Sequence, residues 1–511
     1  MRAAQLLDGM GHLHHAIATS SPEAQRFFDQ GLTLAYGFNH EEAILSFQRA
    51  AELDPNAVMP LWGIALALGP NINVNVNAES EKAAWQAAQT ALAHSANATP
   101  KERAYVEAVA HRYSNDPKTD LHKLAADYRE RMRDLTRQYP DDLDAATLYA
   151  ESIMDLRPWK LWKPDGTPVE DTEEILTVLE GVLRRDPNHI GANHYYIHAQ
   201  EASPHPERAL VSANRLADLC PGAGHLVHMP GHIYIRVGDY EAAVATNERA
   251  IKADDDYVKA TGAQNMYTVM YYHHNVHFLT VARAEQGKAA ETKAAAAKLD
   301  VGIRAVIQQM PMAEGFLTVP LSALLRIEAW DDVPAGAEPG PNLPTATAFR
   351  HFARAIAFAA KGDRDAALKE RTVFVESAKL VPADAEWGLN SAKPVLAIAS
   401  EVLAARFDEN PIPHWRKAVE LQDALGYDEP ADWYYPIRES LGAALLRAGN
   451  AAEAESVFRA CLDRQPRDGR ALFGLLEALK AQNKTTDLDS VRREFDAAWK
   501  GATVPLSLDV L

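Results

Sequence analysis

Residues 31–55 read GLTLAYGFNHEEAILSFQRAAELDP, and this stretch decides the fold class. Within it, residues 41–53 carry apolar side chains three and four positions apart, which is the period of an amphipathic helix. Residues 451–463 show the same pattern, and the alternation typical of strands is scarce along the chain. The sequence therefore predicts an all-α protein.

Small residues and a proline stand at fixed positions in and around this stretch. With Ala24 as position 1 of a repeat, Gly31 is position 8, Ala43 position 20, Ala50 position 27 and Pro55 position 32. These spacings resemble the tetratricopeptide repeat, a unit of about 34 residues. The resemblance implies antiparallel helix pairs that cross at small residues and stack into a superhelical solenoid with a concave groove.

Further copies of this frame occur along the chain. They start at or near Ile190, Gly224, His273, Ala348 and Tyr435. The copies at Ile190 and Gly224 follow each other directly, and those near His273 and Ala348 are less regular. The whole pattern resembles long, bacterial-type tetratricopeptide repeat proteins.

Three stretches rich in Pro, Gly and Asn interrupt the array, at residues 69–80, 163–172 and 331–348. The last is the best candidate for a boundary between two lobes. We therefore predict an N-terminal domain at residues 1–330, which carries the histidines discussed below, and C-terminal repeats at residues 348–511.

Composition excludes several classes of function. The 511 residues carry a net charge of −18, which argues against binding to nucleic acid and to anionic membranes. Cys220 and Cys461 are the two cysteines and cannot form a disulfide framework. A membrane span requires a run of about 18 apolar residues, and the sequence contains no such run. The N-terminus lacks the apolar stretch of a secretory signal, which predicts a cytoplasmic protein and leaves a processed periplasmic form open.

Histidines recur at the same repeat positions. Positions 5 and 9 hold His-x-x-x-His in the Ile190 and Gly224 copies, and positions 2 and 5 hold His-x-x-His in the Gly224 and His273 copies. Residues three or four apart share one face of a helix, and the resemblance implies that this face lines the groove. The predicted metal ligands are His194, His198, His225, His228, His232, His274 and His277.

Two carboxylates are the candidate catalytic residues. Glu201 stands at position 12 of the Ile190 copy, where it would ligate the metal, orient a ligand or act as a general base. Glu151 would face the same groove if Ala150 is position 8 of its helix. His12, His14 and His15 precede the first repeat, and the sequence leaves open a loose tail or a cap that folds into the groove.

Neutral imidazole is the commonest side-chain ligand of transition metals, and copper, iron and zinc all accept it. Magnesium and calcium prefer oxygen ligands, so they are disfavoured. A lone histidine in a repeat usually serves packing and hydrogen bonding, but seven at groove positions in three consecutive repeats are harder to explain in that way. The sequence therefore predicts a copper, iron or zinc site and does not choose among the three metals.

The predicted function is that of a metal-dependent enzyme, oxidative with copper or iron, acting on a small organic substrate in the groove. A zinc-dependent hydrolase and a metal-storage protein are alternatives. A third is a scaffold that holds a peptide or protein partner, the usual role of this repeat. Peptide clamps usually offer Lys, Arg and Asn at the groove positions where this chain has His and Glu. The oligomeric state stays open.

Overall fold

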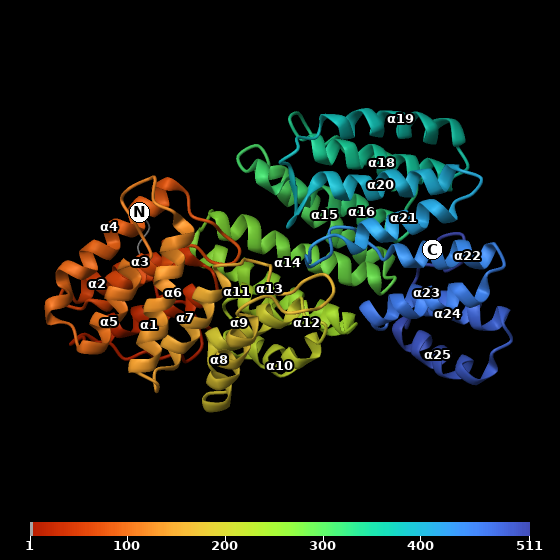
Figure 1. Cartoon of the computed structure of the whole chain (residues 1–511). Helices are drawn as coiled ribbons and strands as arrows, with labels where there is room; N and C mark the ends of the chain where they lie inside the picture. The colour runs from red at the N-terminus through yellow and green to blue at the C-terminus, as the bar shows by residue number, and fades with distance from the viewer. Residues whose placement is uncertain (1–3) are drawn as a thin grey trace. The chain divides into compact units, whose positions relative to one another are not determined.

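The computed structural model describes residues 4–511, whose regular secondary structure is almost entirely α-helical (Figure 1). Within these residues, regular β-structure is confined to one antiparallel hairpin of two short strands, β1 (Glu386–Trp387) and β2 (Asn390–Ser391). No helix in this part of the chain is both long and apolar enough to cross a membrane. The prediction of an all-α fold is confirmed.

By their packing contacts, the described residues fall into two compact units. The first unit contains Met1–Ile233 and Arg249–Tyr272, and the second contains Tyr234–Glu248 and His273–Leu511. The loop-like segment at residues 331–348 therefore lies inside the second unit. The domain boundary predicted there stays a prediction, because compactness alone does not show which part folds independently.

Helices of the first unit follow one another in sequentially packed pairs. They are α1 (Pro22–Tyr36), α2 (His40–Leu53), α3 (Met59–Ala67), α4 (Ala78–His94), α5 (Pro100–Ala110), α6 (Leu121–Gln138), α7 (Leu143–Met154), α8 (Thr172–Arg185), α9 (Ile190–Glu201), α10 (Leu210–Leu219) and α11 (Gly224–His228). Three helices contribute residues to both units: α12 (Pro230–Arg236), α13 (Tyr240–Thr261) and α14 (Met266–Glu285).

The second unit continues with the same kind of pair. Its helices are α15 (Ala289–Val306), α16 (Val319–Arg326), α17 (Asp332–Ala335), α18 (Pro344–Ala360), α19 (Arg364–Leu380), α20 (Ala392–Phe407), α21 (Ile412–Asp423), α22 (Ile437–Arg447), α23 (Ala451–Arg464), α24 (Gly469–Ala481) and α25 (Thr485–Ala498). Figure 1 shows α18 and α19 running side by side, joined by a short turn.

Local sequence sets where the first pair begins and turns. The Ser21 side chain caps α1 by accepting a hydrogen bond from the backbone N–H of Ala24, and Pro22 occupies the first turn. Asn39 caps α2 in the same way, through the backbone N–H of Glu42. Between these helices only Gly37, Phe38 and Asn39 form the turn, which is too short for any arrangement other than an antiparallel pair.

Glycines mark the points where helices cross. A Cβ added at Gly31 would lie 2.6 Å from the Phe47 ring, and one added at Gly63 would lie 2.6 Å from the same ring. The phenylalanine of α2 therefore fits between the glycines of α1 and α3. The copy near the C-terminus repeats this arrangement, since Gly442 and Gly474 both face Phe458. The small-residue positions of the repeat frame thus do the same packing work at both ends of the chain.

Candidate metal centre

Helix α9 carries two of the predicted ligands through the interior of the first unit. All twelve of its residues are buried, and it packs against α1, α7, α8 and α10. The loop after α7 covers its C-terminal half, because Trp162 Nε1 donates a hydrogen bond of 2.8 Å to the carbonyl of Ala199. The histidines of α9 therefore lie inside the unit and not on an open groove surface, and every polar atom of their rings needs a partner.

Three predicted ligands converge in this interior. His194 and His198 lie one turn apart on α9, and His225 comes from α11. One ring nitrogen from each can be chosen so that all three lie within 4.8 Å of one another. Three nitrogens at about 2.0–2.1 Å from one tetrahedral ion would be about 3.3 Å apart, so small side-chain rotations would bring these rings onto a common ion.

Hydrogen bonds fix which nitrogen carries the lone pair in two of the rings. His194 Nδ1 lies 2.5 Å from the Tyr36 carbonyl oxygen at the end of α1, and a carbonyl only accepts, so Nδ1 carries the proton. His198 Nδ1 donates to Glu201 Oε1 over 2.6 Å. In both neutral rings the lone pair is therefore on Nε2. Both Nε2 atoms are buried and have no hydrogen-bond partner.

His225 completes the group in a different way. Its backbone N–H donates to the Tyr267 hydroxyl over 2.9 Å. Its side chain is buried, and neither ring nitrogen has a hydrogen-bond partner. Buried polar atoms are nearly always paired, so four unpartnered nitrogens on three adjacent rings require an explanation, and a metal ion supplies one.

Burial keeps these imidazoles neutral, as metal ligation requires. It lowers the pKa of His194 and of His225 well below the usual value, and neighbouring histidines add to the effect. Burial also lowers the pKa of His198, against the opposing effect of Glu201. Burial alone would raise the pKa of Glu201, but His232 and His198 lower it below its ordinary value. The carboxylate is therefore ionised beside neutral rings.

Glu201 joins two groups of histidines. Its second oxygen, Oε2, accepts a hydrogen bond of 2.6 Å from Nδ1 of His232 on α12. His232 Nε2 in turn lies 2.9 Å from Nε2 of His228. Glu201 therefore orients one imidazole in each group, which is one of the roles that the sequence left open for it. Its role in catalysis stays a prediction.

Aromatic rings enclose the three histidines. Phe38, in the turn after α1, has its ring centroid 4.7 Å from that of His194 and stacks on the rings of His198 and His225. Trp159 meets His198 edge-on at 5.4 Å, and Tyr271 meets His225 at 4.7 Å. Sequence reasoning missed Phe38. Its only sequence signal is a large aromatic residue in a three-residue turn.

Glu151 belongs to a separate buried cluster. Asp155 lies one turn further along and hydrogen-bonds with Glu151. Its Oδ2 forms an ion pair of 2.6 Å with Arg112 Nη2. Burial raises the pKa of Glu151 and raises that of Asp155 well above its ordinary value, where the Glu151 charge adds to it. Glu151 Oε2, Asp155 Oδ1 and Arg112 Nη1 have no hydrogen-bond partner. The catalytic role of Glu151 stays a prediction.

His274 and His277 lie on the second unit's part of α14. Their ring centroids are 6.4 Å apart, and each ring packs edge-on against a phenylalanine, Phe278 and Phe316 respectively. Burial lowers the pKa of His277 to about 3, so this ring is also neutral. Their assignment as metal ligands stays a prediction.

The N-terminal histidines hold the first segment in place. His14 Nδ1 bonds with Asp29, and its ring is mostly exposed. His15 is buried and donates from Nδ1 to Asp144 Oδ2 over 2.7 Å, while Tyr36 donates to the other oxygen of Asp144. The sequence left open a loose tail or a folded cap, and the contacts of His15 fit a segment that is folded onto the unit. His12 is exposed.

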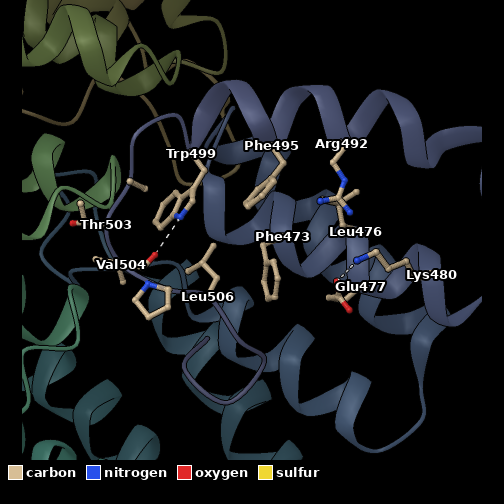
Figure 2. A pocket seen from close by; sticks show the side chains of 12 residues that line it. Phe473, Leu476, Glu477, Lys480, Arg492, Phe495, Trp499, Thr503, Val504 and Leu506 are labelled. Carbon is tan, nitrogen blue, oxygen red and sulfur yellow. Dashed lines mark hydrogen bonds and ion pairs between the residues drawn. The ribbon is translucent and has the colours of Figure 1, made fainter.

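A surface groove of about 410 Å³ lies in the second unit, between α24, α25 and the segment that follows (Figure 2). Figure 2 shows Phe473, Phe495 and Trp499 along its wall, with Lys480 held by Glu477 at one end. Trp499 Nε1 donates to the Val504 carbonyl over 3.3 Å, which fixes the C-terminal segment against α25. None of the predicted metal ligands lines this groove.

The sequence-based frame is supported by comparison with known families. The family model described as "Tetratricopeptide repeat" matches residues 227–257. Those residues form a tetratricopeptide repeat. The repeat contains His228 and His232, and it begins three residues after the copy predicted to start at Gly224. No curated protein matches the sequence significantly.

Solved structures of low similarity also match. A human IFIT1 dimer with PPP-AAAA is 13% identical, with a TM-score of 0.34, and the match covers 94% of this chain and 92% of that one. Yeast Tom70 is 10% identical, with a TM-score of 0.30 and 93% coverage of each chain. Similarity at this level carries no conclusion about ligands or partners.

Proposed function

We propose that this chain is a helical-repeat protein that binds a transition metal ion through Nε2 of His194, Nε2 of His198 and one ring nitrogen of His225. One observation carries the proposal: the three rings each bring a nitrogen within 4.8 Å of the others, and they carry buried nitrogens without hydrogen-bond partners. Hydrogen bonds from Nδ1 to Tyr36 and Glu201 already set the tautomer that ligation needs in two of the rings. Such outer partners are typical of metal-bound histidines.

The donor set narrows the metal. Three neutral imidazoles without a carboxylate favour zinc, copper or iron over magnesium and calcium. Three protein ligands leave a fourth position for water or another small molecule, as in catalytic sites. We further propose that the ion acts on a small organic substrate, by oxidation if it is copper or iron and by hydrolysis if it is zinc.

A binding scaffold is the second candidate, and the tetratricopeptide repeat at residues 227–257 favours it. In that function a peptide or protein partner occupies the concave side of the repeats. The scaffold accounts for the fold, but it leaves the unpartnered nitrogens of His194, His198 and His225 unexplained. Metal storage accounts for both the fold and the nitrogens, and differs from the enzyme only in the use of the fourth position.

Metal content tests the proposal directly. Protein purified without a histidine tag is analysed by plasma mass spectrometry, as isolated and after exposure to zinc, copper or iron followed by desalting. The wild type is expected to hold a fixed number of metal ions per protein chain. The His194→Ala variant is expected to lose the ion of the three-histidine site. His205→Ala is the matched control, because that ring is exposed and pairs with Glu207, away from the other histidines discussed here. Metal-free wild type under all conditions would overturn the proposal.

Azide then separates an enzyme from a store. Azide added to the copper-loaded protein should displace water from the fourth position and produce a new charge-transfer absorption band. A spectrum unchanged by azide would mean that this position is closed, and would favour storage over catalysis.

A further inference from the structure

His228 and His232 form a second pair of imidazoles with the geometry of metal ligands. Both are buried, and their Nε2 atoms are 2.9 Å apart. Two imidazole nitrogens bound to one ion at about 2.0–2.1 Å and at a right angle would also be about 2.9 Å apart. The pair therefore already has the spacing that a shared ion imposes.

Glu201 orients one ring of this pair. Its Oε2 accepts a hydrogen bond of 2.6 Å from His232 Nδ1, so in the neutral ring Nε2 of His232 carries the lone pair. That lone pair faces Nε2 of His228 across the 2.9 Å contact. Metal binding to this pair displaces the proton that the two Nε2 atoms share.

The pair lies next to the three-histidine group. Ring centroids of His198 and His232 are 5.9 Å apart, and those of His225 and His228 are also 5.9 Å apart. Glu201 connects the two groups, because one carboxylate oxygen holds His198 and the other holds His232. A fully buried carboxylate shared between two groups of imidazoles is the arrangement expected of one residue that orients ligands of two ions.

We propose that His228 and His232 bind a second transition metal ion, so that the first unit contains a two-metal centre, and that Glu201 positions ligands of both ions. This proposal rests on the proposed function of the three-histidine site. The second ion has two imidazole ligands from this unit and is therefore expected to bind more weakly than the first. Two adjacent ions can hold two reacting atoms at once, which one ion does less well.

Copper titration with electron paramagnetic resonance tests this inference. Wild type is expected to bind two Cu²⁺ ions per chain, and the fully loaded protein should show a spectrum broadened by magnetic coupling between them. His228→Asn, which keeps a polar side chain at this position, should bind one ion and give the uncoupled spectrum. His205→Ala should behave as wild type. Circular dichroism checks that each variant is folded.

The outcomes separate the two proposals. If wild type binds one copper ion and His228→Asn still binds it, the second site is overturned and the three-histidine site stands. A folded His228→Asn variant that binds no copper would mean a single site shared by all the histidines, and would also overturn the inference. Wild type that binds neither copper nor, in the metal analysis described above, zinc or iron would overturn both proposals.

Glu201→Gln tests the positioning role. A glutamine has one oxygen that accepts and an amide group that only donates, so it cannot accept from both His198 and His232. Both ions are expected to bind 10–100-fold more weakly, a loss typical of such outer partners. Glu180→Gln is the control, since that carboxylate accepts from Tyr196 and pairs with Arg184 but bonds with none of the histidines. A variant in which one ion weakens and the other does not would overturn the shared role.

Discussion

The ring of Phe38 stacks on the imidazole of His225, with ring centroids 5.4 Å apart and ring planes 26° apart. Phe38 stacks in the same way on His198, at 5.8 Å and 23°. Its backbone φ is 57°, in the left-handed region that non-glycine residues adopt at a cost of about 1–3 kcal/mol. The surrounding packing outweighs that cost and places an apolar ring directly over the candidate metal centre.

Phe38→Ala is therefore expected to destabilise the protein and expose the site. Loss of a buried phenylalanine side chain costs about 3–5 kcal/mol in unfolding free energy. Water would enter the space beside His198 and His225, so the loaded protein should release its metal to EDTA faster than wild type. Stopped-flow chelation measures the rate. Phe358→Ala, in the second unit, should release metal at the wild-type rate, and equal rates for both variants would contradict the shielding role.

The His15–Asp144 pair predicts a stability that depends on pH in both directions. Burial alone would lower the pKa of His15, but the hydrogen bond and charge of Asp144 raise it above the usual value. Burial would raise the pKa of Asp144, but the hydrogen bonds from His15 and His189 lower it well below the usual value. The contribution of His15 to the free energy of unfolding is complete below about pH 6.5 and is lost as the pH rises. The contribution of Asp144 is complete above about pH 4 and is lost as the pH falls.

His15→Leu should consequently destabilise the protein more at pH 5 than at pH 9. Urea denaturation at the two pH values, followed by circular dichroism, measures the difference. His14→Leu is the matched control, because the neighbouring ring is 62% exposed. If the destabilisation by His15→Leu is the same at both pH values, the ion pair contributes nothing beyond the packing of the ring.

Replacing glycine by alanine is expected to destabilise the protein at helix crossings and to stabilise it elsewhere in a helix. Gly31→Ala and Gly442→Ala place a Cβ 2.6 and 2.5 Å from the rings of Phe47 and Phe458, and such overpacking costs about 1–3 kcal/mol. Gly181→Ala, in the middle of α8, meets nothing closer than 3.7 Å, and should stabilise its helix by about 0.5–1 kcal/mol. Thermal unfolding of the three variants measures both effects. A stabilising Gly31→Ala would mean that the helices separate without cost.

Glu151→Gln should reduce the loss of stability that accompanies a rise in pH above about 4. Folding raises the pKa of Glu151 and of Asp155, so the unfolded chain loses these protons at lower pH than the folded protein. Stability therefore falls as the pH rises from about 4 towards the raised values. The variant removes one of the two acids and should gain stability relative to wild type between pH 4 and pH 8 in urea denaturation. Glu107→Gln, at an exposed position, should show no such change.

Much of the site follows from the repeat frame. Repeat positions 5 and 9 correctly placed His194 and His198 on one face of a helix. The same positions hold His228 and His232, whose Nε2 atoms are 2.9 Å apart. Position 12 placed Glu201 one turn beyond His198, where it bonds with that ring. These contacts are local or between successive repeats, so a periodic sequence contains the information.

Other parts of the site depend on contacts that no period specifies. Glu151 hydrogen-bonds with Asp155, and Asp155 pairs with Arg112, which lies in the turn after α5 and has no clear repeat register. Phe38 reaches the histidines only because its turn adopts a positive φ. The enclosure of α9 arises from the loop after α7, which the sequence marks as an interruption without indicating where it folds.

The unpartnered nitrogens inside the first unit also have a consequence for the life of the protein in a cell. Any ligand that binds only the folded state adds to its stability in proportion to the logarithm of the ligand concentration, and small losses of stability increase degradation by cellular proteases. Newly made chains in metal-starved cells should therefore be cleared sooner than those in replete cells. The abundance of this protein would then follow the supply of the proposed ion even when its gene is expressed at a constant rate.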